Sequence, residues 1–490
     1  MTRFFGFVLL TATMSLGTEL PFTPAPVDET QPVTFSKDVL PILQNNCQVC
    51  HRPRGIGPMS FLTYESTRPW AKAIKTAILN KQMPPWFADP HYGKFRNAPK
   101  LTQADIHTLV AWADSGAREG DTGDRPPDRQ WPDGWRIRPD VVVSTPEPYY
   151  VPAKGAGEIH EFSVPNPFKE DTWVTGIEVR PGNPSVVHHV IVRIQEPILT
   201  VDGGFKCLDC IARAETAAFV TDVNRANDGI SQGGGSYSDF VTRLRERQTG
   251  LGAFTTMEAV YAPGSPPIDF RFTNSAKLVP ARKPIRIEVH YTPNGKATTD
   301  QTRVAFTLAK GPAQRRFVIM APEHLVDTRK PIPAGEANWE INGELTFTRD
   351  ADLVWFMPHM HLRGKDMTYR LIYPNGREET VLSAKFNFYW QLGYEVEKPI
   401  KVPKGTRMIV TAHHDNSANN PLNPEPTKSV SWGEMTAQEM MLPWFGVVVD
   451  GDAQPDSIAS YRPGDFEGAA PFGTRAVLRV TTPPVTVVAQ

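Results

Sequence analysis

Proline and glycine interrupt this chain too often for it to form mainly long helices. Its 490 residues include 47 prolines and 36 glycines, spread among short runs of valine, isoleucine, threonine and tyrosine. A proline in a helix interior removes a hydrogen bond and clashes with the preceding turn. Short β-branched and aromatic runs bounded by turn residues are typical of strands. We therefore expect a largely β protein.

Chain length and net charge limit the number of domains and the class of partner to be expected. At roughly 150 residues a domain, a chain of 490 residues is expected to form about three domains. The net charge is −1 and the acidic and basic residues are mixed, so the chain lacks the electrostatic footprint of a nucleic-acid-binding protein. We expect no nucleic-acid partner.

The N-terminus resembles a secretory signal peptide. Arg3 precedes an apolar stretch at 4–10, and small residues lead to a plausible cleavage site after Gly17. The alternative, a membrane anchor, needs about 20 apolar residues. We predict a signal peptide at 1–17 and an exported protein, periplasmic or extracellular, with no transmembrane span after cleavage.

A Cys-x-x-Cys-His motif at Cys47, Cys50 and His51 predicts a covalently attached haem c. The two thiols form thioethers with the haem vinyl groups, and the adjacent histidine is the proximal iron ligand. A thiol–disulfide redox pair and half a zinc site are the alternatives. The histidine that directly follows the second cysteine, together with the export signal, fits haem better.

Helical patterns lie on both sides of the motif. One is capped by Ser36 and ends near Cys47, and the other starts at a capping box of Thr102 and Asp105 and stops at Gly116. A haem between an N-terminal and a C-terminal helix resembles a mono-haem cytochrome c. The resemblance implies a small α-helical cytochrome c domain that carries single electrons.

The cytochrome c family usually supplies a distal iron ligand from a methionine that precedes a proline. Met83 matches this pattern, and Met59 is the competitor. His91 and His107 are further alternatives, although surface imidazoles are the plainer interpretation of both. We assign the cytochrome domain to residues 34–120.

A polar, proline-rich linker follows at 121–140, and strand patterns begin after it. The first histidine-bearing strand holds His188 and His189. Adjacent residues of a regular strand face opposite sides, so both rings can bind one ion only at a strand end or a bulge. A second such strand holds His290. One core and one surface histidine, and a hydrogen-bonded His290, are the structural alternatives.

An insert at about 195–252 contains Cys207 and Cys210. The next residue is Ile211, so this is not a second haem site. A local disulfide is expected in an oxidising compartment, with a redox or copper-capturing pair as the alternative. The glycine run at 233–235 suggests a mobile loop.

His359 and His361 are two residues apart, so both imidazoles lie on one face of an extended strand. A softer third ligand from another strand would complete a site suited to copper, which accepts imidazole nitrogen and thioether sulfur. Met440 lies in a pattern Gly-x-x-Thr-x-x-Glu-Met, and Met435 and Met441 are its neighbours.

These residues together resemble the copper type II, ascorbate-dependent monooxygenases, the family of peptidylglycine and dopamine hydroxylases. Bacterial members in which a cytochrome c domain precedes the copper domains are similar as well. The resemblance covers roughly residues 140–485. By motif, His188, His189 and His290 correspond to the ligands of an electron-transfer copper.

By the same resemblance, His359, His361 and Met440 correspond to the catalytic, oxygen-binding copper. The resemblance implies two antiparallel, jelly-roll-like β-sandwich domains with one copper each. We place them at 141–320 and 321–485.

Departures from the family bear on the substrate. Peptide-amidating members carry an arginine where this chain has Met357, and Leu442 and Trp444 lie beyond the methionine ligand. An amidated peptide is therefore not the expected product. His413 and His414 are predicted to be strand residues, with an auxiliary ligand or proton donor as the alternative.

The resemblance implies a copper monooxygenase that hydroxylates a C–H bond of a small organic substrate with O2. Two copper ions and one haem c are its expected cofactors. The electron donor would be ascorbate, a quinol-linked system or another cytochrome. The alternative function is a non-catalytic, exported copper and haem electron-transfer protein.

Overall fold

The computed structural model describes residues 32–460, apart from 54, 131–133, 156, 195–254, 264–266, 282, 323–329 and 433–435. Four predictions lie outside the described residues: the signal peptide at 1–17, the cysteine pair of Cys207 and Cys210, the loop at 233–235, and the alternative ligand Met435. Within the described ranges, no helix is long and apolar enough to cross a membrane.

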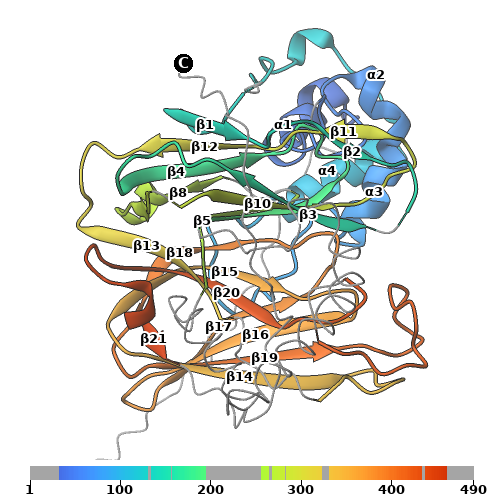
Figure 1. Ribbon diagram of the computed structural model, residues 1–490. Coiled ribbons are helices and arrows are strands. Elements are labelled where there is room, and N and C mark those ends of the chain that lie inside the picture. The colour runs from blue at the N-terminus through green and yellow to red at the C-terminus, as the bar shows by residue number, and fades with distance from the viewer. Residues whose placement is uncertain are drawn as a thin grey trace, which may run out of the picture.

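A small helical unit begins the described chain (Figure 1). Short π- or 3₁₀-helical turns are labelled η. The helical elements are η1 (Phe35–Val39), α1 (Leu40–Asn46), α2 (Tyr64–Thr67), η2 (Arg68–Trp70), α3 (Ala71–Leu79), α4 (Gln103–Asp114) and η3 (Thr122–Asp124), with η4 (Phe270–Thr273) and η5 (Pro455–Ser457) later in the chain. The helical unit has a hydrophobic core of its own, which includes Phe35, Leu40, Leu43, Leu109 and Trp112.

The two predicted helix starts have different outcomes. The capping box of Thr102 and Asp105 is confirmed, because each side chain accepts a hydrogen bond from the other residue's backbone N–H. The prediction that Ser36 caps the first helix is wrong. The N-cap is Thr34, and Ser36 is buried inside the first helical turn.

The rest of the described chain consists of antiparallel strands, which confirms the prediction of a mainly β protein. The first sheet has β1 (Val141–Ser144), β12 (Arg303–Leu308), β4 (Thr172–Arg180) and β8 (Ile268–Asp269), with β9 (Lys277–Val279) also on β4. The second sheet has β3 (Glu158–Val164), β10 (Ile285–Tyr291), β5 (Val187–Ile194) and β7 (Ala259–Tyr261). A two-stranded ribbon joins β11 (Thr298–Asp300) to β2 (Tyr149–Val151).

Two five-stranded sheets follow. The third sheet has β18 (Tyr394–Val402), β15 (Ala351–His359), β20 (Leu442–Asp450), β13 (Arg315–Ala321) and β6 (Thr255–Met257). The fourth sheet has β17 (Glu378–Lys385), β16 (Gly364–Ile372), β19 (Arg407–His414), β14 (Trp339–Phe347) and β21 (Ala459–Ser460).

The implied architecture of two jelly-roll-like β-sandwich domains is wrong. The four large sheets are arranged as a four-bladed β-propeller. One hydrophobic core is shared by the first, second and third sheets, and it includes Ile177, Val190 and Trp444. The resemblance concerned the order of metal-binding residues, and that order does not determine how whole sheets pack.

The third sheet packs on both of its faces. All nine residues of β15 are buried. Trp355 and Met357 belong to the core shared with the first and second sheets, whereas Leu353 and Phe356 belong to the core shared with the fourth sheet. A strand buried on both faces has a continuous apolar sequence instead of an alternating one. Because β15 is such a strand, the histidine at its end lies deep in the molecule.

The helical unit is joined to the third and fourth sheets by the segment between α3 and α4. The amide of Asp89 donates to the carbonyl of Ser383 (2.8 Å), and the amide of Arg96 donates to that of Glu395 (2.9 Å). The Arg96 and Glu395 side chains also form an ion pair. The Trp86 ring meets Tyr394 edge-on at 5.0 Å between centroids, so polar and aromatic contacts both hold the unit there.

A buried ion pair joins three sheets. Glu258 lies where the chain leaves β6 in the third sheet and enters β7 in the second. Its Oε2 lies 3.2 Å from the Nζ of Lys277, which begins β9 on the first sheet. The ammonium group also donates to the carbonyl of Met257 (2.8 Å). Both charged residues are buried, so each depends on the other for compensation.

We expect Lys277→Met to lower the free energy of unfolding by about 3–5 kcal/mol, because it leaves the Glu258 carboxylate buried without its cation. The double variant Lys277→Met/Glu258→Leu should recover most of this loss, since two apolar side chains then replace the pair. Urea unfolding followed by tryptophan fluorescence measures both values. A double variant as unstable as the single one would contradict this account.

Candidate metal centre

A β-bulge places the two adjacent histidines of the second sheet on the same side. His290 on β10 pairs with His189 on β5, whereas the next residue, Tyr291, pairs with Val187. His188 is therefore the extra residue of a bulge, which re-aims a side chain that regular pleating would turn away. The sequence required a strand end or a bulge for a shared site, and the bulge is present.

Nitrogen atoms of His188, His189 and His290 lie within 4.8 Å of one another, and all three residues are buried. The Nε2 of His188 lies 2.5 Å from the carbonyl oxygen of Phe388, so it donates the ring proton there and leaves Nδ1 as an acceptor. That Nδ1 is 3.2 Å from the Nδ1 of His189. The Nδ1 of His290 is buried without a hydrogen-bond partner in the described structure.

A second pair of histidines lies at the end of β15. The Nδ1 of His359 donates to Oε1 of Gln391 (2.6 Å), and its ring stacks on Trp444 at 4.6 Å. The Nδ1 of His361 donates to the carbonyl of Gln438 (3.1 Å). Both rings thus use Nδ1 for a hydrogen bond and retain Nε2 as an acceptor, the arrangement found when a histidine binds a metal.

The two histidine groups form one cluster. The ring centroids of His189 and His359 are 5.7 Å apart, and those of His359 and His361 are 5.5 Å apart. Phe388 stacks on His188 at 4.5 Å. The loop between β17 and β18 therefore serves both groups, with Phe388 on one and Gln391 on the other.

Burial favours the neutral form of four of these imidazoles. It lowers the pKa of His188, and it lowers the pKa values of His189 and His290 well below the usual range, with neighbouring rings adding to the effect. Burial and the nearby His361 lower the pKa of His359 to about 3. A metal binds the neutral form of histidine, so these four rings are in the binding form at neutral pH.

Glu439 joins the segment that carries Met440 to the end of β15. Its buried carboxylate accepts hydrogen bonds from the backbone N–H groups of His361 (3.0 Å), Arg363 (2.6 Å) and Met440 (3.2 Å). Burial raises the pKa of Glu439 to about 7, although those donors oppose the shift. One carboxylate thus fixes the predicted sulfur ligand relative to a predicted imidazole ligand.

The other candidate ligands of this region differ in what surrounds them. Met440 packs against the core shared by the first three sheets, whereas Met441 is buried in the core of the third and fourth. The His413 ring bonds to Asp366 (2.6 Å) on the neighbouring strand β16 of the fourth sheet. The fully buried His414 donates from Nε2 to the carbonyl of Met440 (3.1 Å), so it contacts the predicted ligand through the backbone.

The predicted haem ligands lie in the helical unit. The N–H of His51 donates to the carbonyl of Cys47 (2.9 Å), and its ring stacks on Phe61 at 4.4 Å. Cys47 and Cys50 are not joined to each other, and the buried Nδ1 of His51 has no hydrogen-bond partner in the described chain. Two thiols and an unpartnered imidazole nitrogen fit covalently attached haem.

The two candidate distal methionines differ in their surroundings. Met59 packs against the core of the helical unit, as Cys47 does. Met83 lies after α3, and its amide donates to the carbonyl of Ala77 (3.3 Å). Both side chains are partly buried. The choice of Met83 remains a prediction.

Sequence reasoning missed Gln391 and Phe388, and it used Glu439 only as part of a motif. Gln391 and Phe388 lie between two strands with no recognisable spacing to the histidines, so only the folded chain brings them together. Glu439 could have been suspected, since a glutamate that directly precedes a buried apolar run needs hydrogen-bond donors if it is buried as well.

Comparisons with known proteins add no identification. No family model matches the chain, and no curated protein does. A solved structure of PNGF-II in a C2 space group has a TM-score of 0.22 and 9% identity, over 64% of this chain and 65% of that one, which is less than two thirds of its length. A structure of the infectious bursal disease virus Gt strain has a TM-score of 0.15 and 8% identity, over 67% and 75%. Such low scores support no argument about fold or function.

We expect acid to destabilise the metal-free protein. A histidine with a pKa of about 3 in the folded state and the ordinary value of 6.5 in the unfolded state takes up its proton first when unfolded. Its contribution is therefore complete above pH 6.5 and is lost as the pH falls toward 3. Each such ring adds a slope of about 1.4 kcal/mol per pH unit. Urea midpoints between pH 7.5 and 4 measure this, and an equal slope in His359→Gln would contradict it.

Glu439→Gln should lower the free energy of unfolding by about 1–3 kcal/mol, because an amide NH2 group then faces buried backbone N–H donors. The matched control is Glu425→Gln, an exposed glutamate paired with Lys428, for which we expect a change within about 0.5 kcal/mol. Thermal and urea unfolding compare the two variants. Equal stabilities would show that the Glu439 carboxylate does not organise this segment.

Proposed function

We propose that the chain is an exported copper-dependent monooxygenase that hydroxylates a C–H bond of a small organic substrate with O2. Electrons enter through a covalently bound haem c. One observation carries the proposal: five histidines are buried in one cluster, and their nitrogens divide into a group of three and a group of two. The pair is joined through Glu439 to the segment of Met440.

Each group of ligands would hold one copper ion. His188, His189 and His290 would bind the first through ring nitrogens. His359, His361 and Met440 would bind the second, where the thioether sulfur favours the reduced ion. Bound copper supplies one-electron redox chemistry at each position. The chain's own part is to hold the rings neutral and aligned.

The residues around the pair suit an apolar substrate. Met357 pairs with Trp444 on the neighbouring strand, and both are buried. Trp444 also stacks on His359. An apolar wall of this kind excludes water and offers no cation to a substrate carboxylate, which agrees with the absence of an arginine at position 357.

The haem would serve as the single-electron entry point. Cys47 and Cys50 would attach it, His51 would bind the iron, and Met83 is the predicted distal ligand. Two electrons are needed for each hydroxylation, so an external donor such as ascorbate, a quinol-linked system or another cytochrome must reduce the haem repeatedly.

Metal and haem analysis of the mature protein should find two copper ions for each haem, both visible by electron paramagnetic resonance when oxidised. Met440→Ile should abolish substrate-dependent oxygen consumption and weaken one copper by at least about tenfold, or about 1.4 kcal/mol, with the three-histidine copper retained. His413→Ala, which removes a histidine of the fourth sheet that is no proposed ligand, is the matched control.

One copper or none for each haem, or an unchanged copper content and affinity in Met440→Ile, would contradict the proposed ligand sets. Rapid electron transfer between haem and copper without oxygen consumption with any substrate would assign the chain to the electron-transfer alternative instead.

A further inference from the structure

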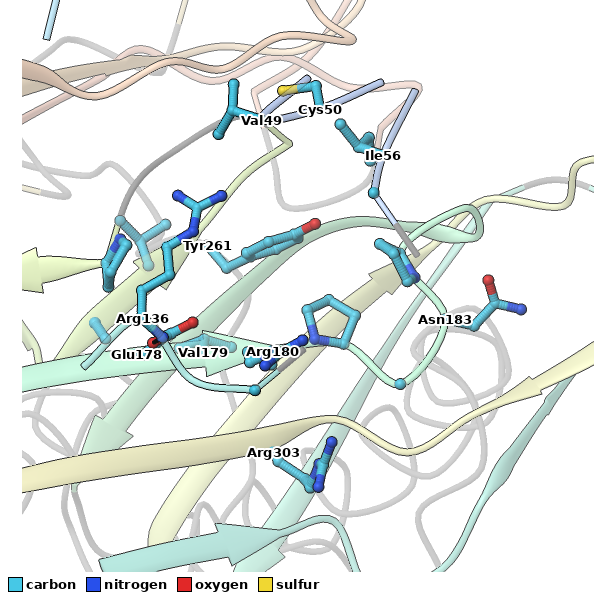
Figure 2. Close-up of a pocket in the computed structure, with 18 of the residues that line it drawn as sticks. Val49, Cys50, Ile56, Arg136, Glu178, Val179, Arg180, Asn183, Tyr261 and Arg303 are labelled. Atoms are coloured by element: carbon cyan, nitrogen blue, oxygen red, sulfur yellow. Dashed lines mark hydrogen bonds between the residues drawn. The ribbon is translucent and has the colours of Figure 1, made fainter. Parts of the chain in front are cut away.

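A cavity of about 410 Å³ lies between the helical unit and the first and second sheets. Val49 and Ile56 of the helical unit form one wall, and Tyr261 of β7 and Arg180 of β4 belong to the opposite one (Figure 2). Pockets of roughly 300–1,000 Å³ are typical of sites for small organic molecules. None of the five clustered histidines is among the described residues that line this cavity, so it is a separate site.

The cavity carries a surplus of positive charge. Four arginines and one carboxylate are among its described lining residues, namely Arg52, Arg136, Arg180, Arg303 and Glu178. The Glu178 carboxylate accepts hydrogen bonds from the backbone N–H groups of Arg136 (2.6 Å) and Ile137 (3.0 Å). Within the part of the chain that the structure describes, no carboxylate forms an ion pair with the guanidinium of Arg136 or Arg303. Such a surplus of cations favours an anionic ligand.

Two of these arginines lie side by side on the first sheet. Arg303 of β12 pairs directly with Arg180 of β4, and like charges at directly opposite positions destabilise a sheet. Both guanidinium groups lie 5.5 Å from the ring centroid of Trp135, which offsets part of their repulsion. A carboxylate bound between them would offset more of it, because guanidinium groups bind carboxylates through paired N–H donors.

The other two arginines lie toward the helical unit. Burial raises the pKa of Cys50, while Arg136 and Arg52 oppose the increase, so both guanidinium groups are within electrostatic reach of this thiol. Burial and Cys50 raise the pKa of Tyr261, whereas Arg136 and Arg180 oppose that increase. Figure 2 shows the Arg136 side chain extending toward the level of Tyr261. The cations therefore form two groups, with a protonated phenol near both.

Apolar side chains line the space as well. Val49 and Ile56 contribute from the helical unit and Ile268 from β8. A water molecule takes up about 30 Å³ of the liquid, so an inorganic anion a few times larger would leave most of the 410 Å³ unfilled. An organic body would cover the apolar side chains and fill the space between the two groups of arginines.

We propose that this cavity is a binding site for an organic acid that carries two carboxylates on an apolar body. One carboxylate lies between Arg180 and Arg303. The other faces Arg52 and Arg136, and the phenol of Tyr261 is a further hydrogen-bond donor. The inference goes beyond the proposed function and does not depend on it, because none of these five residues is a proposed ligand of copper or haem.

The ligand would connect two parts of the molecule. Arg52 belongs to the helical unit and Arg180 to β4, so a bound dicarboxylate joins the unit to the first sheet. Tyr261 pairs with Val190 on β5, and Val190 directly follows His189. The ligand would therefore lie one strand away from the three-histidine group, at the position where the helical unit meets the sheet that carries it.

Calorimetric titration of the full chain with adipate, hexanoate and 1,6-hexanediol tests the proposal, because these probes carry two, one and no carboxylates on similar aliphatic chains. We expect one adipate site, hexanoate binding at least about tenfold weaker, and no binding of the diol. Absence of adipate binding, or equal affinities for adipate and hexanoate, would overturn the proposal. Inorganic phosphate that binds as tightly as adipate would show a site for any oxyanion and would overturn the organic assignment.

Variants locate the binding. Arg180→Gln/Arg303→Gln should weaken adipate at least about tenfold, whereas Arg138→Gln, which changes an exposed arginine that does not line the cavity, should leave its affinity unchanged. Arg303→Gln alone changes an exposed side chain and should weaken adipate in the same direction if the double variant does not fold. An unchanged affinity in the folded cavity variants, or an equal loss in Arg138→Gln, would contradict the assignment to this cavity.

Discussion

Five imidazoles are buried where the second and third sheets meet, so the residues around them must supply hydrogen-bond partners for their ring nitrogens. Each ring has two nitrogens, and a buried polar atom without a partner costs stability. Two carbonyl oxygens and an amide side chain accept from three of the rings, and they come from segments distant in sequence. Nitrogens of His188, His189 and His290 lie within 4.8 Å of one another, so the desolvation that lowers their pKa values also leaves neutral nitrogens grouped where a metal could bind.

The depth of the cluster follows from the third sheet. Because β15 and β20 are buried at nearly every position, the histidine that ends β15 cannot lie at an outer surface. A strand buried on one face only could place its last residue in solvent, where a histidine ring can be protonated. The long apolar sequences of these two strands therefore contribute to the site, because they exclude water from the histidine cluster that lies next to them.

Several features could be predicted from the sequence because they depend on local chemistry. Strand content followed from proline and glycine spacing, the second capping box from Thr102 and Asp105, and the bulge requirement from two adjacent histidines. Features that depend on long-range packing could not be predicted from the sequence. The propeller arrangement replaced the two sandwiches, Thr34 displaced Ser36 as the first cap, and the contact of Phe388 with His188 joins residues 200 positions apart.

The extended segment between α3 and α4 gives the helical unit a second attachment besides its peptide linker. Its backbone hydrogen bonds to β17 and β18, together with the Trp86 and Tyr394 contact, hold the unit in one orientation on the sheets. A carrier domain on a free tether would have to find its partner by diffusion and would depend on solvent viscosity. Here the contacts of the segment with both sheets set the separation between the Cys47–His51 loop and the histidine cluster, which thus belongs to the fold and not to chance encounter.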